Sequence, residues 1–445
     1  MSQVFDASLI DNEIKKKFVS DLTYTPKESR FGNSTPVKHF RYYPDKKIIE
    51  LPYAYARKLI SEDTKEPYLL NTCKDIKLNY SFHGKISQER NREQEDVVIN
   101  SIDFLSMYGT CIINVDPSYG KTRIGTAIAS HFKVKTLIVV AIKPLLDNWK
   151  DSFQEFTNAK YYVVPDKKVD YNSLKSADVI VCTDRKAMKL SEDIKDDIGM
   201  IIIDEAHMFC SPSRITTLLS FSPVYIIALS ATIDKRHVFL DHLCNNDTII
   251  NKVIIRNYII NKVETGFYGI EEYTSYPDKV LKWDVCISSL FNNDKRNDMI
   301  CKIAKKELDN GRTILILTKT KDHVDLLYDK MKGYTDSVEW MYENKNKYNV
   351  SNILIGTISK IGTGMDQVNT CIDFDGKRFD CIIICSTLKK QTIFGQSIGR
   401  GFRDENTIFY YLVDSNSIFN THWKENTKWL KLRKFEIKIV DGTKI

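Results

Sequence analysis

Residues 201–207 read Ile-Ile-Ile-Asp-Glu-Ala-His and join an apolar run to a pair of acidic side chains. The three isoleucines predict a strand that is buried on both faces, as in a parallel sheet. Asp204 and Glu205 follow where this strand should end, which is the edge at which open α/β sheets hold their ligands. Adjacent carboxylates there can divide the work of nucleotide hydrolysis, with Asp204 near Mg²⁺ and Glu205 polarising the attacking water. Taken alone, the segment also fits a buried strand that simply runs into an acidic turn.

A second apolar run, residues 111–115, is followed by a turn and by an apparent helix over residues 124–132. Gly120, Lys121 and Thr122 stand between them. The backbone N–H groups of such a turn and the N-terminus of the helix bind anions. Lys121 can reach the β- and γ-phosphates of a nucleotide, and the Thr122 hydroxyl can ligate Mg²⁺. The sequence therefore predicts a phosphate-binding loop.

This loop departs from the full phosphate-binding motif. A glycine is expected where Val115 stands, and Ser118 and Tyr119 occupy positions that are often small. The Gly-Lys-Thr tripeptide alone is weak evidence for a nucleotide site. The strand before it, the helix after it and the Asp-Glu strand downstream together argue against a chance match.

Three later segments also place polar residues beside apolar strands. Residues 229–232 read Leu-Ser-Ala-Thr and end a predicted strand. Residues 356–366 follow another strand, contain Gly-Thr twice and end in Gly-Met-Asp. Residues 396–403 read Gln-Ser-Ile-Gly-Arg-Gly-Phe-Arg and precede a strand over residues 407–413.

In this order the motifs resemble those of the superfamily 2 helicases of the DEAH type. The resemblance covers residues 90–415, most of the chain. Within the superfamily the chain is most similar to the branch that contains the phage branch-migration helicases, the poxvirus transcript-release helicase and the XPB-type translocases. Residues 145–149, Leu-Leu-Asp-Asn-Trp, fit a pattern of that branch, and residues 313–318 fit the opening strand of its second motor domain.

The resemblance implies an α/β fold with two tandem RecA-like motor domains, each built on a parallel sheet. The length of 445 residues agrees, because it exceeds what one hydrophobic core normally supports. We expect a small N-terminal α+β accessory domain over residues 1–85, motor domain 1 over 86–245, a linker with β character over 246–290, and motor domain 2 with a C-terminal tail over 291–445.

The resemblance also implies a set of site residues. Phosphoryl transfer depends on positioned charge, and the planar guanidinium of arginine binds phosphate oxygens in pairs, so Arg400 and Arg403 would join Lys121 and Glu205 in catalysis. The expected ligands of ATP are Gln94, Ser118, Gly120, Lys121, Thr122, Asp204, Gly364 and Asp366, with Thr122 and Asp204 on Mg²⁺. Coupling of hydrolysis to movement is expected at His207, Ser230, Thr232 and Gln396. Nucleic-acid contacts in motor domain 2 are expected at Thr357, Gly362 and Thr363. Two of these residues have ordinary alternatives: Gln94 as a solvated helix residue and His207 as a structural histidine.

The first 85 residues carry none of these motifs and mix aromatic with basic side chains. Tyr42, Tyr43, Lys46 and Lys47 suit base stacking and phosphate contact, and we expect them to bind nucleic acid. The alternative is a structural domain whose aromatic residues form its own core. Short elements are predicted here, a strand within residues 46–51 and a helix over residues 53–61.

Residues 423–434 of the tail hold two tryptophans among basic residues. They could face nucleic acid, but a helix that packs its tryptophan face on motor domain 2 is the favoured interpretation. The ten cysteines are scattered and show no zinc-ligand spacing, so they are interpreted as small buried hydrophobes in a reducing compartment.

The composition excludes some classes of protein but does not indicate a function. A net charge of +7 is only mildly basic and does not by itself imply nucleic acid. The longest apolar runs are strand-sized, so no membrane span is expected, and the first residues do not read as a secretory signal. We expect a cytoplasmic protein, in the host cytoplasm if the source is a virus or phage.

The predicted function is that of an ATP-dependent DNA helicase or translocase that remodels forked or branched DNA in recombination, replication or repair. An alternative is an ATPase that releases transcripts from RNA polymerase in viral transcription, with RNA and the polymerase as partners. A more distant alternative is the motor subunit of a nuclease. A nucleotide kinase or metabolic ATPase is disfavoured, because it would have one core and no Gln-x-x-Gly-Arg-x-x-Arg motif.

Overall fold

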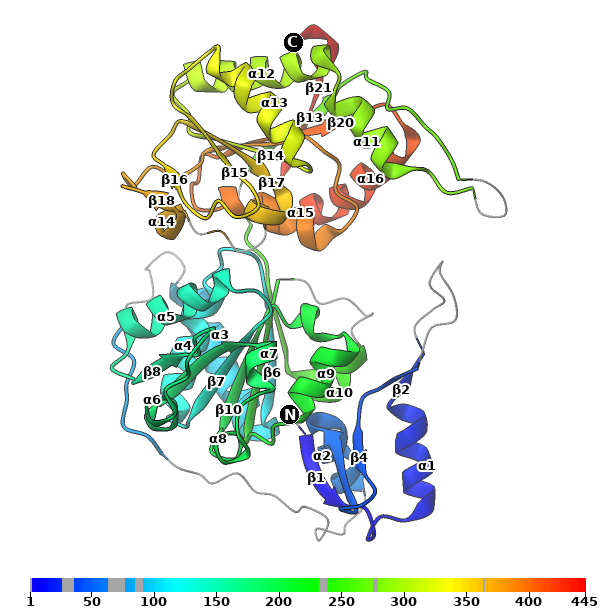
Figure 1. Cartoon of the computed structure of the whole chain (residues 1–445), viewed down its shortest axis with the longest axis vertical. Helices are drawn as coiled ribbons and strands as arrows, with labels where there is room; N and C mark the ends of the chain where they lie inside the picture. Colours follow the sequence, from blue (N-terminus) through cyan, green and yellow to red (C-terminus); the bar gives the residue numbers. More distant parts are fainter. Residues whose placement is uncertain are drawn as a thin grey trace. The chain divides into compact units, whose positions relative to one another are not determined.

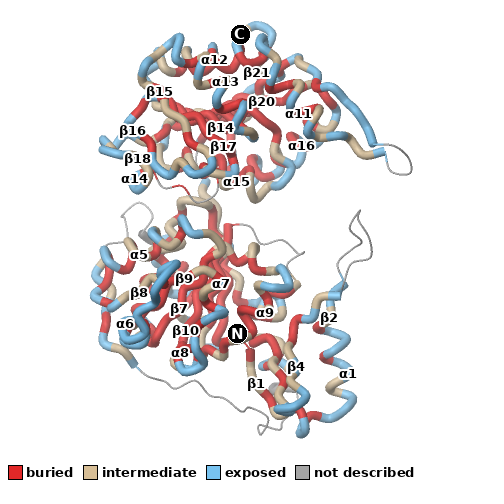
Figure 2. The backbone as a smooth tube through the Cα atoms, viewed as in Figure 1, coloured by how far each residue is buried: buried red, intermediate tan, exposed pale blue. Residues whose placement is uncertain are grey.

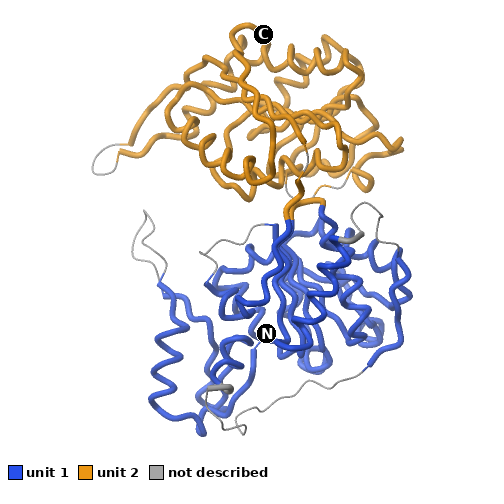
Figure 3. Tube along the Cα trace, turned by 180° about the vertical axis from the view of Figure 1, so that it is seen from behind, with its two compact units in different colours: residues 1–115, 119–252 blue, residues 116–118, 253–445 orange. Residues whose placement is uncertain are grey.

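The computed structural model describes residues 2–25, 36–62, 77–84, 91–231, 238–255, 257–274, 279–362, 365 and 367–445. The chain divides into two compact units, shown in two colours in Figure 3. The first holds Met1–Val115 and Tyr119–Lys252, and the second holds Asp116–Ser118 and Val253–Ile445. Each unit is built on one seven-stranded sheet (Figure 1).

The sheet of the first unit has the order β12-β6-β11-β10-β7-β9-β8, and all neighbouring strands are parallel. Its inner strands are largely apolar and buried, and appear mostly red in Figure 2. Such runs are expected where helices cover both faces of a sheet. The strands are β6 (Thr110–Val115), β7 (Thr136–Val140), β8 (Tyr161–Val163), β9 (Val179–Thr183), β10 (Met200–Asp204), β11 (Tyr225–Ser230) and β12 (Ile249–Lys252).

Helices connect these strands and pack on the sheet. They are α3 (Asn91–Tyr108), α4 (Lys121–Phe132), α5 (Pro144–Phe156), α6 (Tyr171–Ser176), α7 (Asp184–Ala187), α8 (Glu192–Asp196), α9 (Pro212–Leu219) and α10 (Val238–Leu243), with short 3₁₀ turns η3 (Ala206–Phe209) and η4 (Asn246–Thr248). Because every strand pair is parallel, the loops that follow the strands share one edge of the sheet.

The N-terminal residues form a small α+β module within the first unit. Its elements are β1 (Ser2–Asp6), α1 (Asn12–Asp21), β2 (Thr23–Tyr24), β3 (Val37–Lys38), β4 (Arg41–Tyr43), β5 (Ile48–Pro52) and α2 (Tyr53–Glu62). Strands β1, β5 and β4 make an antiparallel sheet that lies beside α9 and α10 in Figure 1. The Ser2 N–H donates to the Phe221 carbonyl at 2.7 Å, and the Tyr53 hydroxyl donates to the Val224 carbonyl at 2.8 Å. Tyr53 is buried in the core of the motor sheet, so module and motor share one core.

The sheet of the second unit has the order β15-β17-β14-β19-β20-β13-β21, again with parallel neighbours. Its strands are β13 (Ile259–Glu264), β14 (Ile314–Thr318), β15 (Val338–Met341), β17 (Ile353–Thr357), β19 (Cys381–Ile384), β20 (Ile408–Val413) and β21 (Glu436–Asp441). The helices are α11 (Trp283–Phe291), α12 (Asp294–Asp309), α13 (Lys321–Lys332), α14 (Gln367–Thr370), α15 (Gln391–Ile398) and α16 (Ser417–Leu432). Short elements complete it: the pair β16 (Tyr348–Asn349) and β18 (Cys371–Ile372), the π-turn η5 (Ile358–Gly362), and the 3₁₀ turns η6 (Gly399–Gly401) and η7 (Gly442–Lys444).

Two parallel sheets in tandem confirm the predicted α/β class with RecA-like domains. The segment predicted as a linker with β character over residues 246–290 contains β12 and β13. These strands belong to the two motor sheets, since their apolar residues are buried there. A nucleic-acid role for the tail tryptophans is contradicted, because Trp423 and Trp429 of α16 are each 7% exposed and belong to the core of the second unit.

No helix in the ranges described above is both long enough and apolar enough to cross a membrane.

Candidate functional site

The order of the first sheet gathers the predicted ATP residues. Strands β6, β11 and β10 are direct neighbours, with Ser230 opposite Asn114 and Ile203 opposite Ala228. The loops after these three strands therefore meet at one edge. Because the phosphate loop follows β6 and the Asp-Glu pair ends β10, the two motifs come within contact distance.

A continuous set of contacts runs from Lys121 to Ser230. The Lys121 Nζ lies 3.5 Å from Glu205 Oε1. The His207 Nδ1 lies 3.4 Å from Glu205 Oε2 and 3.0 Å from Ser230 Oγ. These side chains are largely buried, with Lys121 12% and Glu205 14% exposed. The structure thus brings together four of the predicted residues on one side of the sheet edge.

Asp204 lies deeper, at the end of β10. The Trp149 Nε1–H donates to its Oδ2 at 2.9 Å, and the Glu205 N–H donates to its Oδ1 at 2.9 Å. Burial first, and then the adjacent Glu205 charge, raise the pKa of Asp204 to about 6, although Lys121 and the Trp149 hydrogen bond oppose the rise. A divalent cation bound here would neutralise the negative charge of the two neighbouring, poorly solvated carboxylates. The oxygen donors at this site therefore fit Mg²⁺. In the sequence, Trp149 stood out only because residues 145–149 fit a pattern of the helicase branch. Its hydrogen bond to Asp204 is seen only in the structure.

Two backbone positions shape this edge. Glu205 has a φ of 52°, which is uncommon for a residue with a side chain and carries strain. Gly120 has a φ of 101°, and a Cβ there would lie 2.6 Å from Gln94 Nε2. Glycine at 120 is therefore favoured by its conformation, and a larger residue would also displace the Gln94 amide. Helix α4 begins at the next residue, so Lys121 and Thr122 stand in its first turn.

Gln94 is buried at 4% exposure, which is inconsistent with a solvated helix residue. Its Nε2–H donates to the Tyr119 carbonyl at 2.6 Å, so the phosphate loop holds its amide. Its Oε1 is buried and accepts no hydrogen bond from the residues that the structure describes. A buried acceptor without a donor is costly, and the amino group of adenine could supply that donor.

Several predicted residues lie in the second unit. There the Arg400 guanidinium donates to the Met365 carbonyl and, at 3.0 Å, to the Gly362 carbonyl. Gln396 and Arg403 are partly exposed on and after α15. Ser118, which groups with this unit, donates to the Gly399 carbonyl at 3.0 Å. Thr357 is 6% exposed and Gly362 is also buried, so both residues are largely covered in this structure. Thr232, Thr363, Gly364 and Asp366 lie outside the described residues.

Comparison with known proteins shows which families and proteins this chain resembles. A family model described as type III restriction enzyme, res subunit, matches residues 89–235. A protein described as a helicase from Invertebrate iridescent virus 6 is 27% identical over 415 residues, which span 84% of this chain and 89% of that protein. Another, described as an ATP-dependent RNA helicase from Acanthamoeba polyphaga mimivirus, is 24% identical over 463 residues, spanning 98% of this chain and 85% of that protein. The chain is a helicase of the superfamily 2 type.

A solved structure agrees with the helicase fold. The structure of S. cerevisiae Dbp5 bound to RNA and ADP BeF3 is similar with a TM-score of 0.54 and 12% identity, and covers 80% of this helicase and 93% of that chain. At this identity the likeness concerns the fold alone.

Arg214 is a residue of this helicase that the sequence did not single out. From α9 its Nε–H donates to Asp184 Oδ2 at 2.7 Å and its Nη1–H donates to the Met208 carbonyl at 2.7 Å. A longer bond of 3.4 Å reaches the Ala141 carbonyl. Arg214 thus joins the segments that follow β9, β10 and β7. It stands between motifs, so no local pattern could have marked it.

In the N-terminal module of this helicase, the residues predicted to contact nucleic acid lie around the β4–β5 turn. Tyr42 is 53% exposed, and Lys46 and Lys47 are exposed in the turn. Tyr43 differs, because the Arg41 guanidinium lies 5.0 Å from the centre of its ring. Burial raises the pKa of the Tyr43 hydroxyl. Two lysines and one tyrosine are therefore accessible to a ligand.

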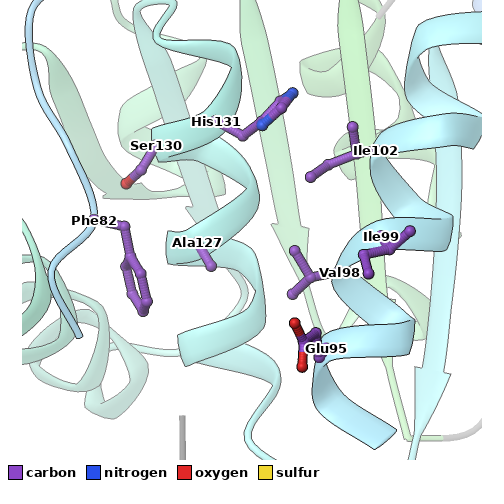
Figure 4. A pocket seen from close by; sticks show the side chains of 8 residues that line it. All are labelled: Phe82, Glu95, Val98, Ile99, Ile102, Ala127, Ser130 and His131. Atoms are coloured by element: carbon purple, nitrogen blue, oxygen red, sulfur yellow. The ribbon is translucent and has the colours of Figure 1, made fainter. Parts of the chain in front are cut away.

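A groove of about 370 Å³ lies between α3 and α4 (Figure 4). Phe82 closes one side of it, and the helices supply an apolar floor with a few polar atoms at the rim. The lining residues are Phe82, Glu95, Val98, Ile99, Ile102, Ala127, Ser130 and His131. None of the residues predicted for ATP or nucleic acid lines this groove.

Proposed function

We propose that this helicase uses ATP hydrolysis to translocate on DNA and remodel forked or branched DNA, as in branch migration during recombination, replication or repair. The observation that carries the proposal is the contact path from Lys121 through Glu205 and His207 to Ser230. It connects the lysine proposed to bind phosphate to the first residue of the Ser-Ala-Thr segment, at the end of β11. Such a path is what a motor needs if nucleotide state is to change the position of another segment.

The residues divide the chemistry as follows. Lys121 would neutralise charge on the β- and γ-phosphates, and Glu205 would orient and deprotonate the attacking water. Thr122 and Asp204 would hold Mg²⁺, which when bound stabilises negative charge on the phosphate oxygens. Gln94 would accept a hydrogen bond from adenine. Water oriented by Glu205 would lie in a largely buried site, where electrostatic stabilisation is stronger than in bulk solvent.

His207 is proposed to couple hydrolysis to movement. Its Nδ1 contacts both Glu205 and Ser230, so a change in the charge around Glu205 alters the balance between the two contacts. Arg400 and Arg403 are both proposed to supply charge to the γ-phosphate, and the Arg400 guanidinium also donates to the Met365 and Gly362 carbonyls. Gln396 and the residues outside the described ranges stay predictions.

A second candidate is an RNA-directed motor that releases transcripts from RNA polymerase in viral transcription. It is favoured by the mimivirus relative, which is described as an ATP-dependent RNA helicase. Both proposed functions would use the same residues to hydrolyse ATP. They differ in whether the protein moves along DNA or along RNA. We propose that the protein acts in the cytoplasm, in the host cytoplasm if the source is a virus or phage.

The test compares ATP hydrolysis with forked DNA, single-stranded DNA, blunt duplex DNA and single-stranded RNA of equal length. We expect forked DNA to stimulate hydrolysis most and RNA least. Strongest stimulation by RNA would select the transcript-directed alternative. Hydrolysis that no nucleic acid changes would contradict both candidates.

A further inference from the structure

The groove between α3 and α4 has an apolar side and a side made by small residues (Figure 4). Val98, Ile99 and Ile102 come from α3, and the Ile99 side chain is 51% exposed. Ala127 and Ser130 come from α4 and are buried, at 9% and 4% exposure. The volume of about 370 Å³ falls in the range of ligand pockets, roughly 300–1,000 Å³.

Covering this groove would leave no polar group of its α4 side unpaired. The Ser130 hydroxyl donates to the Thr126 carbonyl at 2.8 Å, within the same helix. The backbone groups along both helices are bonded within each helix. An apolar ligand can therefore bind here without the cost of burying donors or acceptors that have no partner. Covering the half-exposed Ile99 is favourable, because it removes apolar surface from water.

Acidic side chains surround the exposed apolar residues of α3. Residues 93–108 contain four carboxylates and no lysine or arginine, although the whole chain has a net charge of +7. Glu95 lines the groove, and Asp96 and Asp103 are exposed on the same helix. None of these three carboxylates forms an ion pair with the residues that the structure describes. Negative charge repels the phosphates of nucleic acid, so this face favours a cationic ligand of another kind.

The groove also favours a helical ligand over an extended one. Its sides are side chains of two helices, so it offers an extended peptide no row of backbone partners. Such a peptide would bring unpaired N–H and C=O groups against Val98 and Ile102, which is costly. A helix bonds its own backbone and can place side chains at positions i, i+3, i+4 and i+7 in an apolar groove.

We propose that the groove between α3 and α4 is a docking site for a basic amphipathic helix of a partner protein. Apolar side chains of that helix would cover Ile99, and its lysine or arginine side chains would pair with Glu95 and with Asp103, which stands one turn after Ile99. The inference goes beyond the proposed function, because it concerns a protein ligand and neither ATP nor nucleic acid. The docked helix would contact α4, whose first residue is Lys121.

The experiment uses two fluorescein-labelled helical peptides of about 16 residues, each with leucine at i, i+3, i+4 and i+7. One carries lysine beside the leucine face, and the other carries glutamate in the same places. Binding to the full chain is measured by anisotropy at low and at high salt. Sedimentation of the full chain alone, over a range of concentrations, shows whether it associates with itself.

Two variants test the two parts of the site. Ile99→Ser removes the exposed apolar side chain, and its control is Ile270→Ser, because Ile270 is 57% exposed but belongs to the second unit. Glu95→Lys with Asp103→Lys reverses the charge beside the groove. Its control is Asp322→Lys with Asp329→Lys, which reverses two exposed carboxylates of α13. The rate of ATP hydrolysis, measured on every variant, reports whether the chain is folded.

We expect the lysine peptide to bind the natural chain and the glutamate peptide to bind at least about tenfold more weakly. I99S should weaken the lysine peptide about fivefold, since covering an isoleucine is worth this much. E95K with D103K should weaken it about tenfold and should strengthen the glutamate peptide, because each attraction becomes a repulsion. Both control variants should bind as the natural chain does, and high salt should reduce the preference for the lysine peptide.

The reversed preference of the charge variant separates a specific site from general attraction between a basic peptide and acidic surfaces. The inference is wrong if both peptides bind equally, if I99S binds as the natural chain does, or if the α13 variant loses as much affinity as the α3 variant. It is also wrong if the natural chain forms dimers that I99S abolishes, because the groove then belongs to a second copy. A loss of binding together with a loss of ATP hydrolysis in I99S would assign Ile99 to the fold and overturn its docking role.

Discussion

Lys121 and Glu205 form a 3.5 Å ion pair between two side chains that are nearly out of contact with water. Removing one partner from such a pair leaves the other charge uncompensated in a poorly solvated place. A substitution here therefore changes both chemistry and stability. Each variant at these residues has to be paired with a measurement of folding.

We expect Lys121→Ala to reduce ATP hydrolysis by about 10³-fold or more, because the loss of a cation facing the transferred phosphate costs several kcal/mol in the transition state. The measurement is the turnover rate with saturating nucleic acid, together with the melting temperature. Lys160→Ala is the control, because Lys160 is an exposed lysine of the same unit. Stimulated hydrolysis in a folded K121A protein would contradict the assignment.

Glu205→Gln should retain ATP binding while turnover falls far more. The amide keeps the shape of the side chain but cannot take a proton from water. The variant is expected to hold ATP and nucleic acid together without completing the cycle. Equilibrium binding of a labelled ATP and single-turnover hydrolysis would be compared on the same preparation. A parallel fall in affinity and turnover would identify Glu205 as a binding residue instead.

At the scale of elements, the apolar strands were the most predictable part of the chain. The buried strand predicted from Ile201, Ile202 and Ile203 matches β10, since a run of isoleucines is a local signal. Contacts across long sequence distances had no such signal. Ser2 meets Phe221, Asp166 meets Lys143 and Lys186, and each partner lies in a segment of ordinary composition.

The attachment of the N-terminal module through His39 and His242 should depend on pH. Their Nδ1 atoms lie 3.0 Å apart, and burial, followed by the neighbouring His242, lowers the pKa of His39 from 6.5 to about 4. Burial also lowers the pKa of His242, although Asp21 opposes this. The unfolded chain therefore binds more protons than the folded chain between pH 6.5 and about 4. Stability from this pair is present above pH 6.5 and is lost as the pH falls toward 4.

This pH dependence is measured as the melting temperature between neutral and mildly acidic pH. Other groups also titrate, so the informative quantity is the difference between the natural chain and His39→Gln. We expect that difference to shrink on acidification, because the variant lacks the proton-sensitive ring. A constant difference would mean that the His39–His242 pair does not sense pH.

The β4–β5 turn gives a prediction about nucleic-acid binding. Replacing Lys46 and Lys47 by Ala should weaken binding to forked DNA more than binding to a single strand. If each lysine contacts one phosphate, the salt slope should fall by about one unit per lysine replaced. The hydrolysis rate on single strands, measured in parallel, should stay close to that of the natural chain. Equal affinity of the natural chain for forks and single strands would contradict this role.

Over the whole molecule, the convergence of the residues proposed for ATP in the first unit could be predicted, because their motifs follow strands in a fixed order. Lys121, Glu205, His207 and Ser230 meet as that order implies. The surroundings of these residues were not predictable. The Trp149 bond to Asp204 and the three bonds of Arg214 depend on packing between distant helices, which the spacing of motifs does not encode.

The shared core of the first unit predicts the result of a large deletion. A chain that begins at residue 85 would lack Tyr53, which is 4% exposed in the core beside the motor sheet. Removal of a buried aromatic side chain costs about 3–5 kcal/mol, and the deletion also removes everything else that the module packs against the motor. We expect the shortened protein to melt at a lower temperature or to aggregate. A shortened protein with unchanged melting temperature would show that the module folds and acts separately.

The position of β13 has a consequence for how the protein is made. This strand precedes α11, yet its neighbours in the sheet are β20 and β21 from the last part of the chain. While the ribosome is still adding residues up to 407, β13 has been synthesised but neither neighbour exists. Its unpaired backbone and apolar residues are then open to association with other nascent chains. Ribosomes that stall late in the message would thus release a more aggregation-prone fragment than those that stall just after residue 252, where the strands of the first sheet are complete.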